Sequence, residues 1–129
     1  MAYYLDTSAA VKLVVKEAET VALRRWLRPL DELVSSDLTR TELLRVIRLY
    51  APDRLGAARA VLDALHLVAI TPQVCERAGL LEPTHLRSLD AIHLATALQL
   101  GDDLDGFVTY DQRLTAAAAD NAVTTVAPA

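Results

Sequence analysis

Four carboxylates in this chain have the residue type and the placement that a metal-dependent site needs. Asp6 and Asp111 directly follow short apolar runs, whereas Glu42 and Asp90 lie near the starts of helical patterns. Carboxylate oxygens are the ligands that hard divalent cations such as Mg²⁺ and Mn²⁺ prefer. A cation held in this way acidifies water and neutralises charge on a phosphate, so this set indicates hydrolysis of a phosphodiester.

Asp90 opens the most apolar stretch of the chain. Residues 89–100 are almost all Ala, Leu or Ile, and Gly101 follows them, which predicts a buried helix. Ser88 is the expected N-cap, and Asp90 then falls in the first turn, where the helix dipole favours a negative charge. One interpretation of Asp90 is therefore a helix-start carboxylate. The other is a ligand, because a carboxylate at the mouth of an apolar helix needs a partner or a metal.

Asp6 and Glu42 also have structural interpretations. Asp6, with Thr7 or Ser8, is a candidate N-cap for the helix that follows the first apolar run, and capping does not exclude catalysis. Glu42 stands three residues after Thr39, which is the spacing of a capping box, in which the glutamate folds back onto its own helix start. The sequence alone slightly favours the capping box for Glu42.

Short apolar segments alternate with helical patterns along the chain. Candidate strands occupy residues 2–5, 32–35, 67–70, 107–110 and 123–126, and residues 101–106 are expected to form an acidic turn. The alternation predicts an α/β fold, a three-layer α/β/α sandwich with a mostly parallel central sheet. In a parallel sheet the chain leaves every strand at the same edge, so all four carboxylates can converge there.

The composition is that of one globular domain. The 129 residues are 53% hydrophobic and 23% charged and contain no linker or repeat, so we expect a single domain over residues 1–129. Cys75 is the only cysteine, which rules out an intrachain disulfide and favours a reducing compartment. No apolar stretch is long enough for a membrane span, and the early Asp6 argues against a signal peptide, so we expect a cytoplasmic protein.

The charge balance alone argues against a nucleic-acid partner, because the formal net charge is -4. However, only Lys12 and Lys16 are lysines, and the other basic residues are arginines, which suit bidentate phosphate contacts. Coding bias is the more common cause of such a composition. Negative charge concentrated in a metal site would be offset by bound cations, so RNA stays open as a partner.

Four segments resemble the motifs of PIN-domain ribonucleases, most closely the toxins of VapBC toxin-antitoxin modules. In chain order they are YYLDTSAAVKL, SDLTRTELLR, LRSLDAIHLATA and FVTYDQRL, and together they extend over nearly the whole chain. The resemblance implies a metal-dependent endoribonuclease whose acidic quartet matches the four carboxylates. By this match Asp6, Asp90 and Asp111 hold Mg²⁺ or Mn²⁺. Glu42 is then a direct or water-mediated ligand and a candidate base for the attacking water.

Residues beside the acidic motifs have supporting roles by the same match. Ser8 and Thr109 match small hydroxyl positions that bond the carboxylates or a metal-bound water. Arg87 and Arg113 are candidate phosphate contacts, with surface ion pairing as the alternative. His93, one turn into the apolar helix, is expected to make a structural polar contact rather than to act as a general base.

The resemblance further implies an RNA substrate, a homodimer and a cognate antitoxin that covers or fills the acidic groove with an arginine. Two other classes remain open. A catalytically inactive PIN-like binding module would have the same fold, although all four acidic positions are filled here. Aspartate-based phosphatases and receiver domains typically need an Asp two positions after the first and a late Lys, whereas this chain has Ser8 there and no Lys after Lys16.

Overall fold

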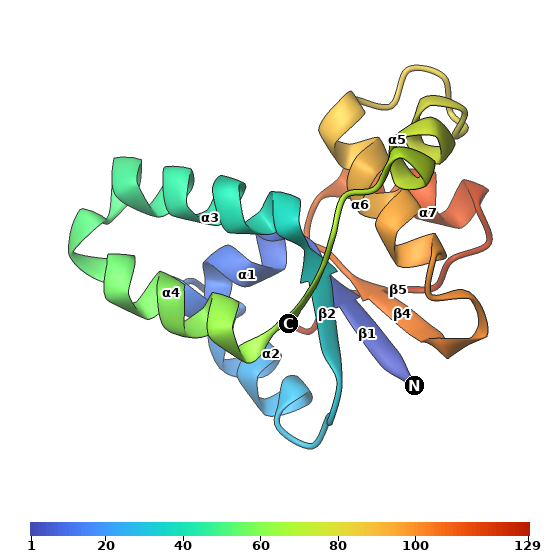
Figure 1. Ribbon diagram of the computed structural model, residues 1–129. Coiled ribbons are helices and arrows are strands. Elements are labelled where there is room, and N and C mark those ends of the chain that lie inside the picture. The colour runs from blue at the N-terminus through green and yellow to red at the C-terminus, as the bar shows by residue number, and fades with distance from the viewer.

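The computed structural model describes residues 1–129, and its central element is a five-stranded sheet in which every neighbouring pair is parallel (Figure 1). The strand order is β3-β2-β1-β4-β5. From β1 the chain adds β2 and β3 on one side of the sheet, then crosses back and adds β4 and β5 on the other side. The strands are β1 (Ala2–Leu5), β2 (Leu33–Ser36), β3 (His66–Val68), β4 (Leu104–Val108) and β5 (Thr125–Val126).

Helices cover both faces of this sheet (Figure 1), with α1 to α4 on one face and α5 to α7 on the other. The three-layer sandwich expected from the sequence is confirmed, and the sheet is wholly parallel. No helix is long and apolar enough to cross a bilayer. The helices are α1 (Thr7–Val14), α2 (Thr20–Leu27), α3 (Asp37–Tyr50), α4 (Leu55–Ala64), α5 (Pro72–Gly79), α6 (Ser88–Leu98) and α7 (Gln112–Asp120), with short 3-10 turns at Pro52–Arg54 and Gly101–Asp103.

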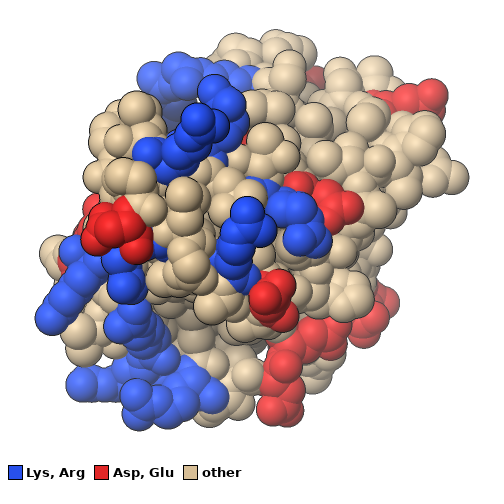
Figure 2. Space-filling model, turned by 60° about the vertical axis from the view of Figure 1, so that its left-hand side comes forward, with Lys and Arg blue, Asp and Glu red and all other residues tan.

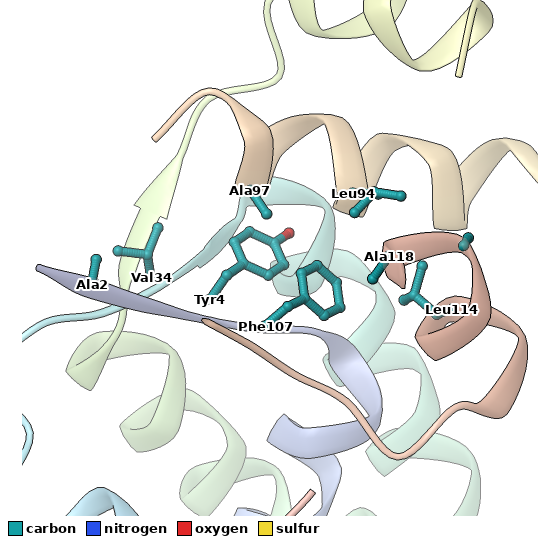
Figure 3. Packing of buried hydrophobic residues seen from close by; sticks show 9 residues of the cluster. Ala2, Tyr4, Val34, Leu94, Ala97, Phe107, Leu114 and Ala118 are labelled. Carbon is teal, nitrogen blue, oxygen red and sulfur yellow. The ribbon is translucent and has the colours of Figure 1, made fainter. Parts of the chain in front are cut away.

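Alternation along the central strand divides the core into two layers. Tyr4 points toward α6 and α7 and stacks on Phe107 of β4, with ring centroids 5.0 Å apart (Figure 3). The next residue, Leu5, packs with Leu23 and Val108 in the layer beneath α1 and α2. This period-2 alternation is what a strand buried on both faces requires.

Strand β4 begins earlier than the sequence predicts, at Leu104 instead of Phe107. Asp105 and Gly106 were expected in an acidic turn, but they lie in β4, and only Gly101–Asp103 form a turn. Pairing with β1 outweighs the weak strand preference of this Asp-Gly pair, since Tyr3 lies opposite Gly106 in the register. A Cβ at position 106 would come within 3.0 Å of the Tyr3 ring, so the glycine permits the close approach.

The register of β1 and β4 brings two polar residues side by side. Leu5 pairs with Val108, and each is the last residue of its strand, so Asp6 and Thr109 leave the sheet next to each other. The strand order reverses between β1 and β4. In open parallel sheets ligands bind at the carboxyl ends of the strands at such a reversal, which locates the candidate site.

Candidate functional site

Asp6 is the deepest carboxylate at this edge of the sheet, with 3% of its surface exposed. It is the N-cap of α1, and its Oδ1 accepts hydrogen bonds from the Ala9 amide at 3.0 Å and the Ser8 hydroxyl at 2.6 Å. Its Oδ2 accepts a hydrogen bond of 2.6 Å from Thr109. Burial raises the pKa of Asp6, although these hydrogen bonds partly offset the effect. The carboxylate is thus fixed in orientation by three donors.

Ser8 and Thr109 connect the turn after β1 with the turn after β4. The Ser8 hydroxyl accepts a hydrogen bond of 3.0 Å from the amide of Tyr110. The Thr109 hydroxyl accepts one of 3.1 Å from the amide of Asp111. Ser8 thus binds the backbone of the opposite turn, and Thr109 binds the Asp6 carboxylate of the opposite turn, which fixes the two turns relative to each other.

Asp90 and Asp111 approach this site from the starts of α6 and α7. Asp111 is the N-cap of α7, where its Oδ1 accepts hydrogen bonds from the amides of Arg113 at 2.8 Å and Leu114 at 3.2 Å. Asp90 lies in the first turn of α6, as expected. Burial raises the pKa of Asp90, and the nearby charge of Asp111 raises it further. The two carboxylates thus repel each other across the site.

Glu42 does not form the capping box that its spacing suggested. The N-cap of α3 is Ser36, and Thr39 lies inside the helix with its hydroxyl 2.7 Å from that of Ser35. Glu42 lies about one turn after Thr39, and its side chain points toward α1. There its Oε1 accepts a hydrogen bond of 2.6 Å from Thr7. The capping-box interpretation is therefore wrong, because the end of β2 starts the helix three residues earlier.

His93 of α6 is the second partner of Glu42, with its Nε2 2.6 Å from Oε1 of the carboxylate. The other ring nitrogen, Nδ1, lies 2.7 Å from the hydroxyl of Tyr4. A carboxylate only accepts, so we assign the proton of a neutral ring to Nε2, with Tyr4 donating to Nδ1. Burial raises the pKa of Glu42, but the hydrogen bonds from His93 and Thr7 outweigh it and leave this pKa below its usual value.

Sequence reasoning missed Tyr4 and the hydrogen-bonding role of Thr7. Tyr4 and Asp6 are two residues apart at the end of one strand, a spacing that places alternate side chains on the same face. That spacing was the available signal for Tyr4. No local pattern pairs Thr7 with Glu42, because the two residues meet only after α1 and α3 have packed together.

The donor chemistry of these carboxylates fits a hard divalent cation. No group of three or more His, Cys, Asp or Glu side chains in this structure is gathered tightly enough to enclose a metal ion. The repulsion that raises the pKa of Asp90 nevertheless comes from Asp111 and also from Glu42, so negative charge faces this site from several elements. A bound cation would relieve that repulsion, and the residues present are compatible with one.

Arg87 and Arg113 flank the carboxylates. Arg87, rather than the expected Ser88, is the N-cap of α6, and it contributes no side-chain capping bond. Arg113 lies in the first turn of α7. Neither guanidinium lies close enough to a carboxylate to form an ion pair, although the charge of Arg87 acts on Asp90 and partly offsets the rise in its pKa. With Asp90 they line a pocket of about 380 Å³.

The net negative charge of the chain is not spread evenly. On the face shown in Figure 2, Lys and Arg side chains gather in several separate groups, with Asp and Glu between and below them. The charge of -4 therefore leaves local basic surface available for an anionic partner.

A family model for the PIN domain matches residues 3–120. The chain belongs to the PIN-domain family. It is 46% identical to Ribonuclease VapC46 of Mycobacterium tuberculosis strain ATCC 25618 / H37Rv over 127 residues, which cover 98% of each protein. It is 42% identical to Ribonuclease VapC47 of Mycobacterium tuberculosis strain CDC 1551 / Oshkosh, covering 97% of this chain and 96% of that protein. The resemblance that the four motifs carry is thereby confirmed.

Solved structures share the PIN fold at lower sequence identity. The crystal structure of Mycobacterium tuberculosis VapC20, described as a Sarcin-Ricin loop cleaving toxin, aligns with a TM-score of 0.76 at 18% identity and covers 98% of this chain and 99% of its own. A toxin-antitoxin complex from Klebsiella pneumoniae aligns with a TM-score of 0.73 at 22% identity and covers 98% of each chain. At these identities the likeness establishes the fold.

Proposed function

We propose that this PIN-domain protein is a divalent-metal-dependent endoribonuclease and the toxin of a type II toxin-antitoxin module. The proposal rests on Asp6 at the carboxyl end of β1, beside the reversal of strand order, and on Asp90, whose pKa is raised by burial and by the charges of Asp111 and Glu42. Support comes from the relatives named Ribonuclease VapC, which are similar over nearly their full length.

In this proposal Asp6, Asp90 and Asp111 hold Mg²⁺ or Mn²⁺, with Glu42 as a direct or water-mediated ligand. When bound, the ion supplies charge neutralisation at the scissile phosphate and lowers the pKa of water. Ser8 and Thr109 keep the Asp6 carboxylate oriented through their 2.6 Å hydrogen bonds. Catalysis by positioned groups depends on such fixed geometry.

Glu42 is the base in the proposed hydrolysis. His93 and Thr7 both bind Oε1, which leaves Oε2 as the oxygen that accepts a proton from the attacking water. The water oxygen forms a bond to phosphorus while the bond to the leaving ribose oxygen breaks. That oxygen takes a proton from solvent. The lowered pKa of Glu42 keeps it ionised at neutral pH and able to accept a proton, while making it a weaker base than an ordinary glutamate.

The proposal includes a cognate antitoxin, a homodimeric state and action in the cytoplasm. Structural neighbours support the first of these, since they include the Klebsiella pneumoniae toxin-antitoxin complex and VapBC2 from Rickettsia felis, which was solved bound to a DNA fragment from its promoter. An arginine of the antitoxin entering the site would pair with the carboxylates and displace the cation. Inhibition would then follow from competition at the site.

The first test is cleavage of total cellular RNA by antitoxin-free protein with Mg²⁺ or Mn²⁺. Parallel reactions contain EDTA or the Asp90→Asn variant, and Asp102→Asn, an exposed aspartate outside the site, is the matched control. We expect discrete products with the wild type and Asp102→Asn and none in the other two reactions. Absence of cleavage by folded wild type with either metal contradicts the nuclease proposal and favours a binding module.

A further inference from the structure

A second feature of the molecule lies beside the carboxylates and has no role in positioning them. It is the pocket of about 380 Å³ lined by residues from the start of α6 and from α7, here called the α6–α7 pocket. Ligand pockets in proteins span roughly 300 to 1,000 Å³, so this one is large enough for a single small ligand. Asp90 lies on its wall, and the pocket is therefore continuous with the candidate site.

The walls of the α6–α7 pocket combine positive charge with apolar surface. Arg87 and Arg113 supply two guanidinium groups that form no ion pair, although Asp90 and Asp120 also line the pocket and the charge of Arg87 acts on Asp90. Leu86 and the exposed Ala116 supply apolar surface between them, and the buried Ala117 lies beneath. A ligand that matches these walls carries an anionic group next to a flat apolar one.

Charge is distributed along this pocket with the basic end next to the carboxylates. Arg113 lies in the first turn of α7, and the acidic Asp120 ends that helix seven residues later, roughly 10 Å away. The guanidinium groups of Arg87 and Arg113 attract the anionic group of a ligand to the end of the pocket away from Asp120, against the charge of Asp90 on the same wall, and the apolar group is directed along α7. Arginine suits the anionic end because its planar fork binds phosphate oxygens in pairs.

We propose that the α6–α7 pocket holds one unpaired nucleotide of a single-stranded RNA, next to the nucleotide whose phosphate is cut. Arg87 and Arg113 bind its phosphate, and its base packs against Leu86 and Ala116. The base must be unpaired to enter, as is usual in recognition of single-stranded RNA. This inference rests on the proposed nuclease function and assigns it a subsite.

Ala116 offers a variant that fills the pocket without changing its charge. Ala116 is exposed on α7 and lines the pocket, whereas Ala119 is exposed on the same helix outside it. Ala116→Leu and Ala119→Leu are therefore matched substitutions with almost equal helix propensity. Arg113→Ala removes one guanidinium of the pocket, and Arg25→Ala on the exposed side of α2 is its control.

The measurement is the anisotropy of a fluorescent single-stranded oligoribonucleotide titrated with protein in EDTA, so that binding is recorded without cleavage. We expect about tenfold weaker binding with Ala116→Leu, in line with the loss of one packed base, and wild-type affinity with Ala119→Leu. Across a salt series Arg113→Ala lowers the slope of log affinity against log salt by at most about 0.7, the value for one single-strand phosphate, because Arg87 still contacts that phosphate, and Arg25→Ala leaves the slope unchanged. Circular dichroism establishes that all four variants are folded.

A second arm measures kcat/KM for cleavage with Mn²⁺ and separates the two proposals. If Ala116→Leu and Ala119→Leu bind RNA equally well, the subsite is wrong whether or not the wild type cleaves. If only Ala116→Leu binds weakly, the subsite holds even where no cleavage occurs. A wild type that cleaves but binds too weakly for titration is judged by kcat/KM, where equal values for the two alanine variants overturn the subsite. A wild type that neither binds nor cleaves overturns both proposals.

Discussion

The hydroxyl of Thr109 donates a hydrogen bond of 2.6 Å to Oδ2 of Asp6, joining residues that are 103 positions apart in the chain. The bond crosses from the end of β4 to the end of β1, the point at which the strand order reverses. Asp6 lies beside Thr109 because Leu5 and Val108 are register partners and both strands end there. The orientation of the deepest carboxylate is thus a property of the sheet and not of α1 alone.

Thr109→Val should therefore weaken both the site and the fold. Valine retains the shape of threonine but leaves Oδ2 of Asp6 and the Asp111 amide without their shared partner. We expect a loss of about 1–3 kcal/mol in the free energy of unfolding and at least a tenfold lower cleavage rate. Urea unfolding and initial rates with Mn²⁺ measure the two effects. Thr124→Val, at an exposed threonine near the edge strand, is the control, and an equal loss there would contradict this explanation.

The hydroxyl of Tyr4 should influence cleavage through His93 and Glu42. Tyr4→Phe keeps the buried ring stacked on Phe107 but leaves Nδ1 of His93 without its 2.7 Å partner. We expect kcat to fall several-fold with KM nearly unchanged, because the carboxylate of Glu42 loses part of its support. Tyr3→Phe is the matched control, since the Tyr3 ring packs on Trp26 and its hydroxyl has no hydrogen bond. A changed KM with unchanged kcat would assign Tyr4 to substrate binding instead.

The sequence predicted the parallel sandwich and the placement of Asp6 and Asp111 because both depend on local patterns. Short apolar runs that end in a polar residue identify strand ends, and the aspartates cap the helices that follow. The capping-box interpretation of Glu42 fails because Ser36 and Thr39 are both plausible caps, and only the pairing of β2 determines where α3 begins. The contact between Tyr4 and His93 depends on packing of α6 over the sheet, which no local pattern contains.

Asp90→Asn should stabilise the metal-free protein at neutral pH. The pKa of Asp90 is raised in the folded state, so the folded protein binds this proton more tightly than the unfolded chain does. The stabilisation of the folded state that comes from binding this proton is complete at pH values below the usual pKa of 3.8. It is lost as the pH rises through the raised pKa of the folded state. We expect a gain of at most about 1 kcal/mol at pH 7, because Asp90 is only partly buried, and no gain near pH 3. Thermal melts in EDTA across this range test it, and a gain that grows as the pH falls would reverse the assigned sign.

With Mn²⁺ bound, the wild type should become more stable than Asp90→Asn, the reverse of their order in EDTA. An ion that binds only the folded protein stabilises it by about 2.7 kcal/mol when its concentration is a hundredfold above its dissociation constant. The wild type should therefore melt at a higher temperature with Mn²⁺ than in EDTA, while Asp90→Asn and Asp111→Asn, each lacking one proposed ligand, should shift much less. Asp102→Asn, which keeps all four site carboxylates, should respond like the wild type. Melts with Mn²⁺, Ca²⁺ and EDTA measure this without any RNA, so the result is independent of cleavage. Equal shifts in all four proteins would mean that the ion binds elsewhere, and the proposed ligand set would be wrong.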